Sequence, residues 1–96
     1  MTNTVNKEIA QFVEGQSYPL RSTGNGLNTY WREYEIVGRN ILIQLCFEMP
    51  HSLEAKNITI SRVRDVGFWA SVEDQEGNWG CSGLIGWDHW SLKTIN

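Results

Sequence analysis

Residues 66–90, VGFWASVEDQEGNWGCSGLIGWDHW, decide the fold of this 96-residue chain. The stretch contains four of the five tryptophans and five of the nine glycines. Phe68, Ala70 and Val72 alternate along a predicted strand, and residues 74–78 form a turn in which Gly77 can adopt a left-handed conformation. Residues 79–85 then return as a second strand. The stretch therefore predicts a β-hairpin followed by a tight corner.

Glycine recurs every three residues from the turn through the second strand to the corner, at positions 77, 80, 83 and 86. Glycine inside a strand usually marks a bulge, a sharp bend or the close approach of another backbone. We expect this strand to coil strongly, as the strands of barrels do. Residues 86–90 then form the corner, and a last short strand runs over residues 91–95.

A second hairpin is predicted around Gly38, between residues 27–37 and residues 40–48. The apolar face of the later strand is formed by Ile41, Ile43, Leu45 and Phe47. In the earlier strand, Tyr30, Tyr34 and Ile36 are expected on the core side, and Trp31, Glu33 and Glu35 on the solvent side.

Two more strands and one helix complete the prediction. Residues 57–64 alternate as a strand, and residues 16–23 are expected to form at best an edge strand, because Pro19 donates no ladder hydrogen bond. Residues 7–14 are predicted to be a helix with an apolar stripe of Ile9, Phe12 and Val13, capped by Asn6 and closed by Gly15. We expect residues 1–5 to be a flexible tail and residues 6–96 to form a single domain.

The predicted fold is mainly β (α+β): a small, antiparallel, strongly bent sheet, or an SH3-like partly open barrel, of six to seven strands with one short N-terminal helix. The connections are too short for parallel crossovers. The ending, a short strand after a one-turn corner, resembles the SH3-like barrel class over roughly residues 16–95. This resemblance is architectural and implies nothing about activity.

The net charge of the chain limits the classes of partner that it is expected to bind. Eight basic residues against 11 acidic ones give a formal net charge of −3, the wrong sign for general binding to a phosphate backbone. Nucleic acid is therefore disfavoured, and a protein with a basic surface fits better. With no secretory leader pattern and no long apolar run, we expect a cytoplasmic protein that does not enter a membrane. Cys46 and Cys81 are then expected to be buried small hydrophobes, although a disulfide between them is an alternative.

The sequence offers weak signals for chemistry. Residues 80–83, GCSG, do not match the G-x-S-x-G pattern of a nucleophile elbow, and a pair of Cys81 with His51 or His89 has no special support. The cysteines and histidines lack zinc-site spacing, and residues 73–78 lack the ligand order of a calcium loop. We therefore predict no enzyme activity, no cofactor and no metal.

Tryptophan is the anomaly, because a small barrel has room for only about two or three fully buried indoles. Exposed aromatic residues usually mark interaction sites. The alternative is that the helix and loops cover them as a second small core. The predicted partner-binding residues are Trp31, Trp69, Glu73, Asp74, Glu76, Trp79, Trp87, Asp88, His89 and Trp90.

These observations favour a small non-enzymatic protein that binds another protein through an aromatic, acidic surface. A compact inhibitor from a phage or mobile element and a toxin-immunity protein both fit this class. A small-ligand or carbohydrate module is the alternative, with Trp69, Trp87 or Trp90 stacking on a sugar and Asp88 or His89 binding its hydroxyls. A binder of single-stranded nucleic acid is a further alternative, which has the aromatic residues but lacks the charge.

Overall fold

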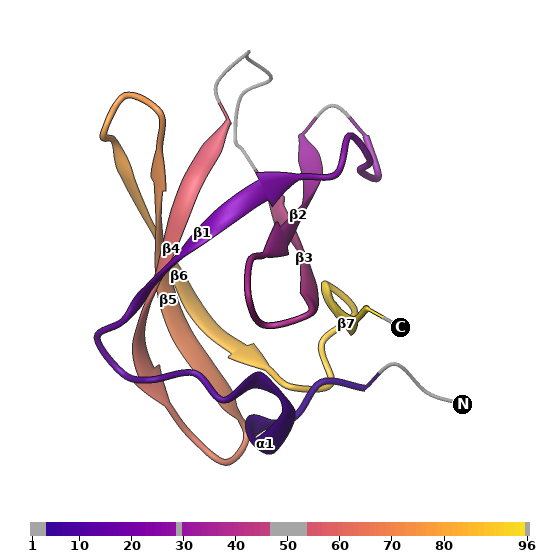
Figure 1. Cartoon of the computed structure of the whole chain (residues 1–96), viewed down its shortest axis with the longest axis vertical. Coiled ribbons are helices and arrows are strands. Elements are labelled where there is room, and N and C mark those ends of the chain that lie inside the picture. Colours follow the sequence, from indigo (N-terminus) through magenta and orange to yellow (C-terminus); the bar gives the residue numbers. More distant parts are fainter. Residues whose placement is uncertain (1–3, 29, 47–53, 96) are drawn as a thin grey trace.

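The chain forms one rolled antiparallel sheet with the strand order β6-β5-β4-β1-β2-β3-β7 (Figure 1). The computed structural model describes residues 4–28, 30–46 and 54–95, with residues 81 and 82 described by their backbone alone. The elements are α1 (Lys7–Ala10), β1 (Ser17–Ser22), β2 (Trp31–Ile36), β3 (Ile41–Cys46), β4 (Ala55–Val63), β5 (Gly67–Asp74), β6 (Trp79–Gly86) and β7 (Leu92–Thr94). The predicted small, antiparallel, strongly bent sheet is confirmed.

Strand β1 is the bend that joins the two halves of the sheet. Its first half, Ser17 to Pro19, pairs with β4, and its second half, Leu20 to Ser22, pairs with β2. Pro19 stands where one ladder ends and the other begins, so its missing N–H interrupts neither. The expected edge position of this strand is therefore wrong, because the strand changes partners at the proline.

A corner in the chain separates the last two strands, β6 and β7. Every neighbouring pair in the sheet is antiparallel, so β6 and β7, at opposite ends of the strand order, run in the same direction. Figure 1 shows the chain leaving β6 and crossing to β7 beside β3. Strand β7 pairs only with Ile41, Leu42 and Ile43, so the end of β3 at Leu45 and Cys46 extends beyond it.

The inside of the roll holds a single aliphatic and aromatic core. Its buried members are Val5, Ala10, Phe12, Tyr18, Tyr34, Ile36, Ile41, Ile43, Ala55, Ile58, Ile60, Phe68, Ala70, Trp87 and Leu92. Strands β3, β4 and β5 supply seven of these residues, and the rest come from β1, β2, β7, the corner and the N-terminal segment. Val5, expected in the flexible tail, is only 1% exposed, because the chain before α1 lies against this core.

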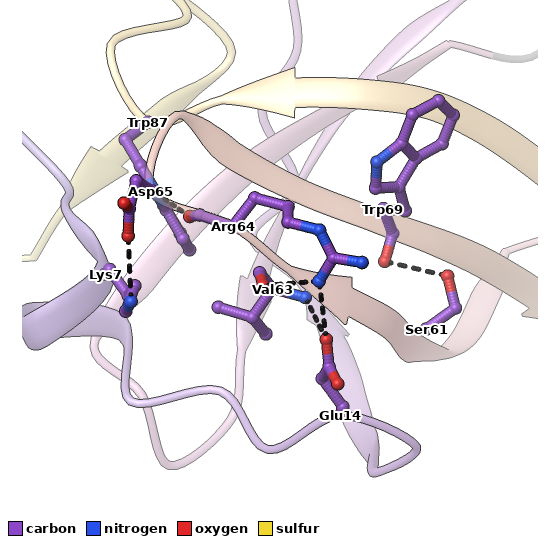
Figure 2. Close-up of polar contacts among 8 residues, drawn as sticks. All are labelled: Lys7, Glu14, Ser61, Val63, Arg64, Asp65, Trp69 and Trp87. Carbon is purple, nitrogen blue, oxygen red and sulfur yellow. Dashed lines mark hydrogen bonds and ion pairs between the residues drawn. The ribbon is translucent and has the colours of Figure 1, made fainter.

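An aromatic cluster anchors the corner between β6 and β7. The Trp87 ring lies 5.1 Å from the Phe68 ring and 6.1 Å from the Phe12 ring, measured between centroids. Its indole Nε1 donates a hydrogen bond of 3.0 Å to the Arg64 carbonyl (Figure 2). The buried indole therefore has both an apolar environment and a polar partner, as buried tryptophans require.

The N-terminal helix is shorter than predicted. Asn6 caps it as expected, with its side chain accepting a 2.8 Å hydrogen bond from the Ile9 amide. The helix ends at Ala10, and its cap Gln11 adopts the left-handed conformation with φ 51°, four residues before the predicted closing residue Gly15. This early end turns Phe12 into the core and leaves Ile9 and Val13 exposed. The predicted apolar stripe is thus wrong at two of its three positions.

Strand β2 departs from the predicted pattern at two residues. Glu33, expected in solvent, is 7% exposed. The preceding loop covers it, with the Thr23 hydroxyl donating to its carboxylate at 2.8 Å and Gln44 Nε2 donating at 3.2 Å. Tyr30, expected on the core side, is 44% exposed because it lies before the strand begins.

Two ion pairs hold the segment around α1 to the end of the sheet (Figure 2). Lys7 lies 3.0 Å from Asp65, and Arg64 lies 3.1 Å from Glu14. The Glu14 carboxylate also accepts a hydrogen bond from the Val63 amide, and this bond, followed by Arg64, holds its pKa below the ordinary value. Glu14 therefore keeps its charge, and with it these contacts, in mildly acidic solution.

Within the described ranges, no helix has the length and hydropathy needed to cross a bilayer.

Replacement of Trp87 tests whether the corner depends on its indole. We expect Trp87→Ala to lower the free energy of unfolding by about 3–5 kcal/mol, because it empties a core site and removes the shorter of two hydrogen bonds to the Arg64 carbonyl. The matched control is Trp90→Ala, whose indole is 57% exposed and whose loss should cost about 1 kcal/mol or less. Urea unfolding of both variants measures the difference. Equal losses would contradict the assigned role of Trp87.

Candidate functional site

The five indoles divide between the core and the surface. Trp87 is 7% exposed, whereas Trp79 and Trp90 are 55% and 57% exposed, and Trp69 is 38% exposed. Trp31 is half-buried. The alternative in which a second small core seals all the indoles is therefore excluded. Exposed aromatic area remains for a partner or ligand.

Three of the non-core indoles surround one cleft. A cavity of about 420 Å³ opens between the free edge of β6 and the end of β3. It is lined by Trp31, Gln44, Leu45, Cys46, Val72, Asp74, Asn78, Trp79, Gly80, Ile85, His89 and Ser91. Trp90 packs against Trp31 beside it. The volume lies in the range of small-molecule and side-chain binding sites.

The topology of the last strands creates this cleft. β7 covers β3 only as far as Ile43, and the Gln44 amide makes one further hydrogen bond to the Ser91 carbonyl (2.9 Å). Beyond that point the Leu45 and Cys46 edge of β3 faces β6 across the gap. Val72 and Ile85, which are partly buried and pack against the core, line the cleft from the β5–β6 side.

An aromatic wall forms one side of the cleft. Trp31 and Trp90 meet edge to face, with centroids 5.0 Å apart and an interplanar angle of 61°. The His89 ring lies 5.2 Å from Trp90. Its Nδ1 accepts a hydrogen bond from the Ser91 amide (3.2 Å) and lies 2.7 Å from the Ser91 hydroxyl. These contacts orient the imidazole within the turn, and they hold the wall in place before anything binds.

The β5–β6 hairpin places acidic groups at the other side. The Asp74 carboxylate organises the turn by accepting hydrogen bonds from the amides of Glu76 (2.8 Å) and Asn78 (3.0 Å). Glu73 accepts from Asn57 Nδ2 at 3.2 Å, and Glu76 is exposed at the tip. The Trp79 end of the cleft therefore carries negative charge.

Two features of the lining leave room for an occupant. A Cβ added to Gly80 would meet no atom within 4 Å, so this position borders open space. The Gln44 side chain donates to Glu33, but its Oε1 is buried without a hydrogen-bond donor among the described residues.

The predicted site residues fall into three groups. The structure brings together Trp31, Asp74, Trp79, His89 and Trp90 at the cleft, with Glu73 and Glu76 on the adjoining hairpin. Trp69 lies on the outer face of β5, paired with Leu84, and Figure 2 shows its indole standing apart from the other side chains drawn. Asp88 is exposed on the corner. Trp87 belongs to the core and is not available to a partner.

Sequence reasoning missed the part of the cleft that β3 contributes. No motif includes Gln44, Leu45 or Cys46. The alternation of apolar residues in this strand predicts that Leu45 faces the core. The one usable signal is length, because the predicted final strand is too short to cover all of residues 40–48. Cys46 is exposed rather than buried for the same reason. The side chain of Cys81 and the predicted core residue Phe47 lie outside the described part, as does His51.

Within the residues that the structure describes, no three His, Cys, Asp or Glu side chains come close enough to hold a metal ion. The polar groups at the cleft instead form turns and hydrogen bonds suited to orienting a bound molecule. Comparison with known protein families, with curated proteins and with solved structures finds no match to this chain.

Quenching of tryptophan fluorescence tests the division of the indoles. We expect acrylamide to quench most of the emission of the native chain, leaving a blue-shifted fraction that comes from Trp87. Trp79→Phe and Trp90→Phe should each reduce the quenchable fraction. Trp87→Phe should remove the protected one, because only that indole is enclosed. If Trp79 or Trp90 accounts for the protected fraction, the assignment of the exposed indoles is wrong.

Proposed function

We propose that this chain is a non-enzymatic binding protein that engages another protein through the cleft between β6 and the end of β3. The observation that carries the proposal is the exposure of Trp79 and Trp90 at an open, partly apolar cleft. Exposed aromatic groups beside a concave surface are the usual anchors of protein–protein interfaces. Trp31 supports this role by packing against Trp90.

The preferred partner has a basic surface. Glu73, Asp74 and Glu76 lie on the hairpin beside the cleft, and they would attract cationic groups and repel phosphates. This charge argues against the single-stranded nucleic-acid alternative. A small inhibitor or a toxin-immunity protein needs only a rigid surface, so the proposal includes both, acting in the cytoplasm.

A small-molecule or carbohydrate ligand is the second candidate. It is favoured by the cavity of about 420 Å³, which suits a ring-sized ligand. The residues concerned differ in part from those expected from the sequence. The cleft offers Trp31 and Trp79 for stacking, and Asn78 together with the expected His89 for hydrogen bonds. Trp69 and Trp87 do not line it.

Selection of peptides from a random linear library against the full chain tests the proposed function. We expect selected peptides to bind the native chain and to lose about thirtyfold in affinity or more on Trp79→Ala or Trp90→Ala, because truncation of an anchor residue costs roughly 2 kcal/mol or more. The affinities can be measured by isothermal titration calorimetry.

Trp69→Ala is the matched control, since it removes a partly exposed indole from the outer face and should leave the affinity unchanged. Peptides whose binding depends on Trp69 and not on Trp79 or Trp90 would place the interaction elsewhere. A library that yields no binder, together with a fluorescence change on adding a sugar or metabolite, would favour the second candidate.

A further inference from the structure

We propose that the free edge of β6 takes up an extended peptide segment of the partner as an additional antiparallel strand. The segment would place one apolar side chain in the cleft and carry basic residues at its two ends. This inference rests on the proposed function and specifies the partner's chemistry. It follows from the strand edge, a glycine in it and the charges around it.

The first observation is that β6 is an unprotected edge. It ends the strand order of the sheet, and its eight residues, WGCSGLIG, contain no charged side chain and no proline. The opposite edge, β7, has three residues and includes Lys93. Proteins usually protect edge strands by shortness, charge or proline, because unpaired backbone groups accept another strand. Strand β7 is protected by its shortness and charge, whereas β6 has neither. The register shift of β6 lies between Cys81 and Leu84 and leaves regular pairing at Trp79–Cys81, the part of the strand beside the cleft.

The second observation is that the space around Gly80 and its conformation do not require glycine in the isolated chain. Gly80 and Gly83 do not have positive φ, and a Cβ added to either would meet no atom within 4 Å. Gly67 differs, because its Cβ would overlap the Ile85 carbonyl. Glycine weakens a strand unless another backbone or a ligand approaches closely. Gly83 lies at the register shift of β6 between the partners of Trp69 and Ser71, where glycine is explained by a bulge. We therefore assign Gly80 alone to the approach of a second strand.

The third observation is apolar surface at the same edge. Trp79 and Leu84 are exposed, and Val72, Ile85 and Leu45 pack against the core from positions in or beside the cleft. Successive side chains of a strand point to opposite faces. A segment paired with β6 can therefore send one side chain into the cleft while its neighbours face solvent.

The fourth observation is the negative charge at both ends of β6, which indicates what kind of segment would pair with this edge. Glu76 lies at the Trp79 end of β6, and Asp88 lies at the Gly86 end, with its Oδ1 3.0 Å from the position of a Gly86 Cβ. The ion pairs of the described residues use Lys7, Arg21, Arg32, Arg64 and Lys93. None of them involves Glu76 or Asp88. A peptide with Lys or Arg near both ends complements these carboxylates.

A second copy of this chain is the competing occupant, and the same charges disfavour it. Pairing β6 with β6 of another molecule would bring Glu76 and Asp88 of one copy to the same edge as those of the other. Like charges placed together in this way oppose association. The basic peptide is therefore the occupant to which the inference commits.

The test uses the peptides selected for Trp79-dependent binding, each about 12 residues long so as to span β6. Single backbone N-methyl groups are placed at successive positions and binding is measured by calorimetry. We expect a period of two, in which methylation weakens binding about tenfold at positions whose N–H faces β6 and has little effect at positions between them. Replacement of the terminal basic residues by Gln should also weaken binding and reduce its salt dependence.

Variants of the chain supply an independent readout. Gly80→Val should raise or preserve the urea midpoint, since it puts a β-branched residue into a strand with room for it, and should weaken peptide binding about tenfold or more by filling the cleft. The matched control is Gly83→Val, which also meets open space but does not line the cleft and should bind nearly as the native chain does.

The outcomes separate this inference from the proposed function. If no library peptide binds through Trp79 or Trp90, both fail. If such peptides bind but tolerate N-methylation without a period of two, the protein-binding function stands and the added strand is overturned. Concentration-dependent dimerisation in sedimentation, lost on Gly80→Val, would assign the edge to a second copy and overturn it as well.

Discussion

The corner anchored by Trp87 is the constraint on which the rest of the structure depends. It lets the chain leave β6, pass over five residues and continue in the same direction as β7 against the other half of the sheet. A connection of this length cannot run back to make β7 a parallel neighbour of β6. Strand β7 therefore pairs with β3 only along Ile41–Ile43, and a gap stays open beyond that point.

The same corner links stability to the candidate site. Trp87 packs with Phe12 and Phe68, while His89 and Trp90, two and three residues further on, stand at the wall of the cleft. The buried indole thus fixes the position of the exposed one. A rigid turn loses little conformational freedom when a partner binds, which favours affinity.

The distribution of charge indicates which kind of partner the cleft favours. The cationic side chains are largely used in ion pairs with carboxylates of β2, the loop before β4, and the segments around α1. The carboxylates beside β6 remain at the surface. An aromatic, uncharged strand edge with acidic ends is suited to a cationic, extended partner more than to nucleic acid or to a copy of itself.

The sequence by itself determined the local structure. Alternation in residues 40–48, 57–64 and 68–73 identified three strands and their core faces, and glycine at 38 and 77 identified two turns, because these patterns depend on short-range sterics. Composition also showed that some indole would stay outside the core. Only the tertiary structure decided which one is enclosed, since Trp79, Trp87 and Trp90 occupy similar local sequence and differ only in what packs on them.

Non-local contacts explain the remaining differences. The covering of Glu33, the central place of β1 despite Pro19, and the early end of α1 at Ala10 each depend on segments distant in sequence. The cleft was beyond sequence analysis for the same reason, because it is made by the length difference between β7 and β3, whose pairing no local pattern reveals. Residue chemistry can be read from neighbours along the chain, but a concave site exists only once distant strands are set side by side.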